Sequence, residues 1–154
     1  NALFVGYDAR GAARYGNLRG TMGAYKGEVS GSDKHFSFSI PGESNTVHLF
    51  ESAIDLMSYA TLQLFEGHDW RRDSLLSLAG LPPLVGFYAK DHPRVNTLRL
   101  HLDNDEIGRG AVAGIVSGLN GRFQVYDEPP ACGKDVNDQL KMRVGIFKKE
   151  AYCR

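Results

Sequence analysis

The chain has 154 residues, with 18 lysines and arginines against 18 aspartates and glutamates, and 42% of its residues are hydrophobic. This composition is that of an ordinary globular domain, and it excludes both a disordered tail and a membrane span of roughly 20 apolar residues. Two cysteines without a signal-peptide pattern are too few for a disulfide framework or a zinc site, so we expect a reducing, cytoplasmic setting.

The first 45 residues are rich in glycine and show short alternations of apolar and polar side chains. This pattern is typical of a β-hairpin followed by an irregular segment. The expected elements are a strand at 4–8, a second strand at 14–19, a loop at 20–31 and a half-buried strand at 35–40. The breaker cluster PGESN at 41–45 ends this part, and we place a domain boundary after it.

From residue 46 onward, short apolar strands alternate with helical patterns. The predicted strands are 47–50, 75–78, 97–102 and 123–126, and the predicted helices are 52–65, 82–91, 107–119 and 135–142. This alternation predicts an α/β domain at 46–154, with a parallel sheet of about four strands and helices on both faces. Its end is a basic tail, because 139–154 contain five basic residues and one acid.

Acidic residues follow three of the four predicted strands. Glu51 follows the first, Asp103 and Asp105 follow the third, and Asp127 and Glu128 follow the fourth. Ligands of parallel sheets bind at the carboxyl ends of the strands, so we expect a cluster of like charges there. Such a cluster needs a cation, and Mg²⁺ fits because it takes hard oxygen ligands and keeps water or phosphate in its other positions.

Structural roles for these acids stay open. Asp103 or Asp105 can serve as the N-cap of the helix that starts near Ile107, and Glu51 can be a first-turn acid that the helix dipole favours. A calcium loop of the EF-hand type is excluded, because Ile107 and Gly114 stand where that loop needs oxygen ligands.

Other motifs for phosphate binding or hydrolysis fit poorly. Gly108, Gly110 and Gly114 have the wrong spacing for a dinucleotide fingerprint. Gly133 and Lys134 lack the upstream glycine of a phosphate-binding loop. No serine stands in a nucleophile elbow, so a hydrolytic triad is unsupported.

Two segments together resemble the Toprim domain, the catalytic module shared by topoisomerases and bacterial primases. They are 50–56 (FESAIDL) and, about fifty residues later, 102–111 (LDNDEIGRGA). In the Toprim motif, a glutamate ends one strand and an acid-x-acid pair ends another, with glycine and arginine soon after. The resemblance covers 46 to about 143 and is closest to Toprim-like domains of uncharacterised bacterial proteins on plasmids and conjugative elements. The loop GKDVND at 133–138 is similar to the aspartate loop that follows the fourth strand in primase-type members.

The resemblance implies a catalytic site that uses Mg²⁺ or Mn²⁺. Glu51 would be the general acid/base or a metal ligand, Asp103 and Asp105 would hold the metal, and Asp135 would be a further ligand. Topoisomerases of the family also use a tyrosine on another domain. None of the seven tyrosines here matches that position, so strand passage is unsupported.

The first 45 residues resemble the end of the basic subdomain that precedes Toprim in bacterial replicative primases. Arg19, beside Gly20, and Lys34, before His35, stand in places similar to the basic residues near the nucleic-acid groove there. An alternative is a solvated hairpin with ordinary surface cations. The residues that the resemblance implies as nucleic-acid contacts are Arg14, Arg19, Lys34, Arg109 and Lys134.

The sequence therefore leads to a specific hypothesis. It is a Mg²⁺-dependent, primase-like module of a larger mobile-element protein, which transfers nucleotides to a 3′-hydroxyl on a single-stranded DNA template. Phosphoryl transfer needs charge neutralisation and alignment, which metal-binding carboxylates supply. The alternatives are a Toprim nuclease and a non-catalytic module that binds nucleic acid or a replication or helicase partner.

Overall fold

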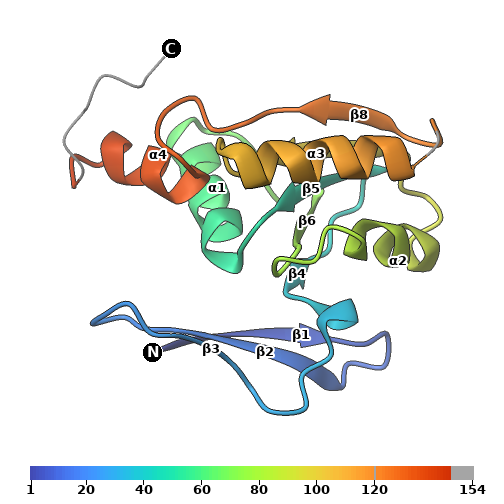
Figure 1. The fold of residues 1–154 in the computed structure, drawn as a ribbon, viewed down its shortest axis with the longest axis horizontal. Helices are drawn as coiled ribbons and strands as arrows, with labels where there is room; N and C mark the ends of the chain where they lie inside the picture. The colour runs from blue at the N-terminus through green and yellow to red at the C-terminus, as the bar shows by residue number, and fades with distance from the viewer. Residues whose placement is uncertain (120, 147–154) are drawn as a thin grey trace.

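The computed structural model describes residues 1–119 and 121–146, which contain two separate sheets, the smaller one below the larger one in Figure 1. The smaller sheet is antiparallel and has the strand order β1-β2-β3. Its strands are β1 (Ala2–Tyr7), β2 (Ala13–Arg19) and β3 (Lys26–Glu28). The hairpin of β1 and β2 confirms the two strands that the alternation predicts.

The larger sheet has five strands in the order β4-β6-β5-β7-β8. Its strands are β4 (Ser39–Ile40), β5 (Thr46–Phe50), β6 (Ser74–Ser77), β7 (Thr97–His101) and β8 (Gln124–Asp127). The last four are parallel, and β4 pairs antiparallel with β6 at one edge. The predicted parallel sheet of four strands is therefore confirmed, with one short antiparallel strand added.

Helices cover both faces of this sheet, as the alternating pattern predicts. They are α1 (Ala53–Phe65), α2 (Leu84–Asp91), α3 (Glu106–Gly118) and α4 (Val136–Arg143). One core cluster joins the sheet to α2 and α3 and includes Leu49, Leu98 and Ile115. A second cluster joins the other face to α1 and α4 and includes Phe50 and Leu56. Burial of these apolar faces holds the strand ends in a fixed arrangement.

Two expectations for the N-terminal part are wrong in detail. The predicted strand at 35–40 begins as a 3₁₀ helix, η1 (Lys34–Phe36), because Asp33 caps it by accepting a hydrogen bond from the backbone N–H of His35 at 3.0 Å. Only Ser39–Ile40 forms a strand, and it joins the larger sheet although it precedes the boundary that we predict. The predicted loop at 20–31 contains β3.

Three contacts hold the N-terminal part beside the larger sheet and its helices, one from β1 and two from η1. The rings of Phe4 and Phe38 meet edge to face at 5.2 Å between centroids, and those of His35 and Phe87 lie 4.2 Å apart. Lys34 Nζ donates to the carbonyl oxygen of Ala79 at 3.3 Å. These contacts place the small sheet opposite the carboxyl ends of β5 and β6 (Figure 1).

Two further observations concern the chain as a whole. Among the helices of the described residues, none is long and apolar enough to cross a membrane. The second half of the predicted basic tail, residues 147–154, lies outside the described residues.

Candidate active site

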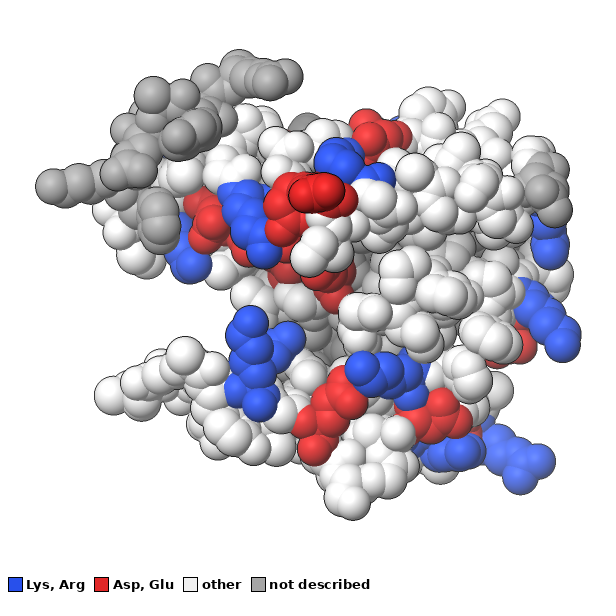
Figure 2. Space-filling model, in the orientation of Figure 1, with Lys and Arg blue, Asp and Glu red and all other residues white. Residues whose placement is uncertain are grey.

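A cleft of about 580 Å³ separates the two sheets. Figure 2 shows it as a hollow between two lobes, with acidic side chains gathered on the wall formed by the larger lobe and basic side chains on the opposite wall. We call the side formed by the larger sheet the floor and the side formed by the smaller sheet the roof. The polar and charged side chains that line the cleft are Tyr15, Asn17, Arg19, Lys26, Glu28, Glu51, Ser52, Asp55, Ser77, Asp103, Lys134, Asp135 and Asn137.

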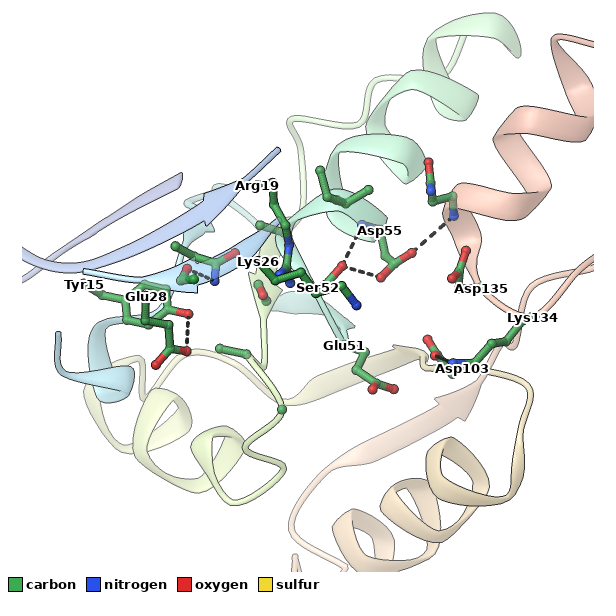
Figure 3. A pocket seen from close by; sticks show the side chains of 18 residues that line it. Tyr15, Arg19, Lys26, Glu28, Glu51, Ser52, Asp55, Asp103, Lys134 and Asp135 are labelled. Atoms are coloured by element: carbon green, nitrogen blue, oxygen red, sulfur yellow. Dashed lines mark hydrogen bonds and ion pairs between the residues drawn. The ribbon is translucent and has the colours of Figure 1, made fainter. Parts of the chain in front are cut away.

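Glu51 lies on the floor directly after β5, the central strand of the larger sheet (Figure 3). The next residue, Ser52, is the N-cap of α1, and its hydroxyl accepts a hydrogen bond from the backbone N–H of Asp55 at 3.3 Å. Partial burial raises the pKa of the Glu51 carboxyl, and the charges of Asp103 and Asp105 raise it further. A carboxyl with a raised pKa suits the general acid/base role that the motif implies.

Asp103 follows the neighbouring strand β7 and is only 7% exposed. The turn after it is tight, because a Cβ on Gly108 would lie 2.1 Å from the carbonyl oxygen of Asp103. Asp105 Oδ1 accepts a hydrogen bond from the backbone N–H of Gly108 at 2.8 Å and so caps α3. Asp105 therefore has the capping role that the sequence left open, and its second oxygen stays available for a cation.

The ammonium group of Lys134 bridges the two aspartates. Its Nζ lies 3.1 Å from Asp103 Oδ2 and 3.1 Å from Asp105 Oδ2. The two carboxylates raise the pKa of Lys134. The pKa of Asp105 is lowered by the hydrogen bond from Gly108 and by the lysine. The geometry shows that both carboxylates are aimed at one cation position.

Asp135 also lines the cleft, next to Lys134 (Figure 3). Its Oδ1 accepts a hydrogen bond from the backbone N–H of Asp138 at 2.7 Å and caps α4. Burial raises the pKa of the Asp135 carboxyl. The capping bond uses one oxygen, so Asp135 has one oxygen left to face the cleft.

Asp55 is a cleft residue that the sequence analysis did not select. It is 6% exposed on α1, and its Oδ2 accepts a hydrogen bond from the Ser52 hydroxyl at 2.5 Å. Its Oδ1 accepts a second bond from the backbone N–H of Asn137 at 3.2 Å, which ties α1 to α4. Burial raises the pKa of Asp55 to about 6.

The roof of the cleft carries two basic side chains that face the acids, Arg19 on β2 and Lys26 on β3 (Figure 3). They are directly opposite each other in the antiparallel register, so their side chains point to the same face. Within residues 1–119 and 121–146, no ion pair involves either of them. Arg19 was predicted as a nucleic-acid contact, whereas Lys26 was missed because its segment was interpreted as a loop.

Three of the predicted nucleic-acid contacts, Arg14, Lys34 and Arg109, lie outside the cleft lining and pair with other side chains. Arg14 pairs with Asp8 at 3.4 Å, and Lys34 pairs with Glu28 at 3.1 Å. Arg109 donates to both carboxylate oxygens of Asp127, at 2.9 and 2.8 Å, and also to the carbonyl oxygens of Leu102 and Asp103. Of the five predicted contacts, only Arg19 and Lys134 line the cleft.

The floor fits a magnesium ion held by few protein ligands. No three acidic, histidine or cysteine side chains of the described residues converge closely enough to form a complete metal cage. Mg²⁺ does not require one, since it is commonly bound by one or two carboxylates and keeps waters or substrate phosphates. Asp103 and Asp105 supply two carboxylates that already share one cation, with Glu51 close enough for its pKa to respond to both.

Residues 48–140 match the family described as Toprim-like. The chain belongs to the Toprim-like family. Residues 1–44 match a second family, described only as a protein of unknown function (DUF3991). The Toprim-like match contains all four predicted acids, Glu51, Asp103, Asp105 and Asp135.

Two curated proteins are similar to this Toprim-like chain. An uncharacterised protein of Bacillus anthracis is 32% identical over 131 residues, which cover 75% of this chain and 37% of that protein. A 65 kDa protein of Zymomonas mobilis is 28% identical over 165 residues, which cover 98% of this chain and 28% of that protein. The chain thus spans about a third of the length of these relatives.

Solved primase structures have the same fold. The primase fragment of the bacteriophage T7 primase-helicase superposes with a TM-score of 0.62 at 14% identity, over 92% of this chain and 60% of that one. A DNA primase domain from Pseudomonas aeruginosa superposes with a TM-score of 0.59 at 14% identity, over 96% of this chain and 50% of that one. Both alignments include the small sheet as well as the Toprim-like sheet, because they cover more than nine-tenths of the chain.

Proposed function

We propose that this chain is the catalytic module of a primase-like enzyme that transfers nucleotides to a 3′-hydroxyl on a single-stranded DNA template, with Mg²⁺ or Mn²⁺ as cofactor. One observation carries the proposal. The acids that end β5 and β7, Glu51 and Asp103, face the unpaired cations Arg19 and Lys26 across one cleft. A phosphate chain between these walls would meet a metal on one side and basic side chains on the other.

Each wall would have a different task. Asp103 and Asp105 would hold the metal, which supplies charge neutralisation and alignment of the phosphate oxygens when bound. Glu51 would accept the proton of the attacking hydroxyl, since its raised pKa brings it closer to neutral pH. Arg19 and Lys26 would bind phosphates of the template or the nucleotide. Asp135 is proposed as a further metal ligand.

The test is a primer-synthesis assay with labelled nucleotides on a single-stranded template. Because the chain spans about a third of its relatives, the assay should use the longest protein that contains it. We expect incorporation that depends on Mg²⁺ or Mn²⁺ and falls by at least about a hundredfold in Glu51→Gln and in Asp103→Asn. Cleavage of the template without incorporation would favour a nuclease. DNA binding without either reaction would favour a non-catalytic binding module.

The proposal includes the setting of the module. We propose that it works in the cytoplasm, within a larger replication protein of a mobile element that also contacts a helicase or another replication partner. The lengths of the two curated relatives are consistent with additional domains around the module.

A further inference from the structure

Lys134 occupies the position at which Asp103 and Asp105 converge. We propose that its ammonium group is a built-in counter-cation that a divalent metal ion must displace, and that the released side chain then binds a phosphate of the substrate. This inference rests on the proposed function, because it assigns the order of events at the same site.

The position of the ammonium is set by the acids rather than by chance packing. Asp103 has a side chain that is only 9% exposed, and an ionised carboxylate so buried is costly without a partner. Asp105 uses Oδ1 for the helix cap and turns Oδ2 to the lysine. The two like charges therefore need a shared cation whenever no metal is present.

The lysine is held by its backbone and free to move at its tip. Its carbonyl oxygen accepts a hydrogen bond from the backbone N–H of Asn104 at 2.7 Å, which anchors Lys134 to the turn between the two acids. Its side chain is 56% exposed and has four rotatable bonds, so leaving the carboxylates requires no backbone change. Displacement therefore moves the charge without moving the loop.

After displacement, the ammonium group of Lys134 would remain in the cleft. Lys134 lines the cleft on the floor, and the unpaired Arg19 lines the roof. A lysine that leaves the carboxylates stays within the cleft, where the substrate phosphates of the proposed reaction would lie. The metal and the lysine then bind different groups, the metal the carboxylates and the lysine a phosphate.

The proposed exchange, in which a metal ion replaces the Lys134 ammonium between Asp103 and Asp105, predicts that one substitution strengthens metal binding and weakens triphosphate binding. Lys134→Met removes the competing cation, so Mn²⁺ should bind about tenfold more tightly, which corresponds to about 1.4 kcal/mol for two ion pairs. The same variant loses a phosphate contact, so a nucleoside triphosphate at saturating Mn²⁺ should bind several-fold more weakly. If Lys134 had a purely structural role, its removal would weaken both Mn²⁺ binding and triphosphate binding.

The experiment measures Mn²⁺ binding from the loss of the electron paramagnetic resonance signal of free Mn²⁺, and triphosphate binding by calorimetry. Lys134→Arg keeps the charge and should bind Mn²⁺ like the parent. Lys90→Met removes an exposed lysine of α2 and serves as the matched control. Lys134→Gln provides a second neutral variant in case the methionine variant does not fold, and circular dichroism checks each fold.

The outcomes separate the two proposals. Equal or weaker Mn²⁺ binding by folded Lys134→Met and Lys134→Gln, compared with the parent, overturns the exchange but leaves the proposed metal site intact. Tighter Mn²⁺ binding without weaker triphosphate binding overturns the claim that the released Lys134 binds a phosphate of the substrate. Failure of every form, the parent included, to bind Mn²⁺ overturns the proposed function together with the exchange.

Discussion

Arg109 and Asp127 form an ion pair in which a single arginine nitrogen, Nη1, donates to both carboxylate oxygens, at 2.9 and 2.8 Å. The same guanidinium donates through Nη2 to the carbonyl oxygens of Leu102 and Asp103, at 2.9 and 3.2 Å. Arg109 thus joins β8 to the turn that carries a proposed metal ligand.

We expect Arg109→Ala to destabilise the fold by about 1 to 2 kcal/mol, because several charge-assisted hydrogen bonds are lost. Urea denaturation would measure this change. Arg10→Ala, which removes an exposed side chain of the β1–β2 turn, is the control and should have little effect. Unchanged stability with weaker DNA binding would instead support the nucleic-acid role that the sequence implies for Arg109.

Gly108 should be intolerant of any side chain. A Cβ there would lie 2.1 Å from the carbonyl oxygen of Asp103, so Gly108→Ala must push the acidic turn away from α3. We expect a loss of about 1 to 3 kcal/mol in unfolding free energy. Gly110→Ala in the same helix meets nothing within 4 Å and should be neutral or stabilising by up to about 1 kcal/mol. Equal effects of the two substitutions would contradict this account of the turn.

Asp55 should make stability depend on pH. Its pKa is about 6 in the folded chain and 3.8 as the ordinary value, so the protonated carboxyl favours folding. This contribution is complete below about pH 4 and is lost as the pH rises through about 6. Asp55→Asn cannot ionise and keeps an acceptor for Asn137.

The free energy of unfolding of Asp55→Asn should therefore equal that of the parent near pH 4 and exceed it by about 2 to 3 kcal/mol at pH 8. Chemical denaturation at several pH values measures the difference. Asp91→Asn, at an exposed position on α2, should show no such trend. A gap between Asp55→Asn and the parent that stays constant from pH 4 to pH 8 would rule out the raised pKa as its cause.

The roof cations should contribute to binding of single-stranded DNA. Arg19→Ala and Lys26→Ala should each weaken binding and reduce the slope of log affinity against log salt by about 0.7. Arg14→Ala is a matched control, because Arg14 pairs with Asp8 and lies over the ring of Phe36. Fluorescence anisotropy at several salt concentrations measures the slopes. Equal slopes for Arg14→Ala and Arg19→Ala would refute the assignment of the roof cations as nucleic-acid contacts.

The sequence predicts the floor of the cleft well, because strand periodicity and acidic strand ends are local signals. Glu51 and Asp103 lie at the carboxyl ends of paired parallel strands, as the pattern indicates. The roof is harder to predict. Lys26 belongs to a three-residue strand between exposed residues, which gives no alternation to detect.

Other features depend on contacts between distant segments. The pairing of Lys134 with Asp103 joins residues that are separated by a helix and a strand, and only the folded turn brings them together. Asp55 stands in the recognised motif, yet its burial results from the packing of α4 on α1. A pattern of charges in the sequence does not distinguish such paired side chains from free ones.

The most direct measurement of the central claim is the anomalous diffraction of a crystal grown with Mn²⁺. We predict a manganese peak in contact with the carboxylates of Asp103 and Asp105, beside Glu51, with the Lys134 ammonium moved into the cleft. Absence of a peak there, with Lys134 still bridging the two carboxylates at saturating Mn²⁺, would contradict a metal-dependent active site in this chain.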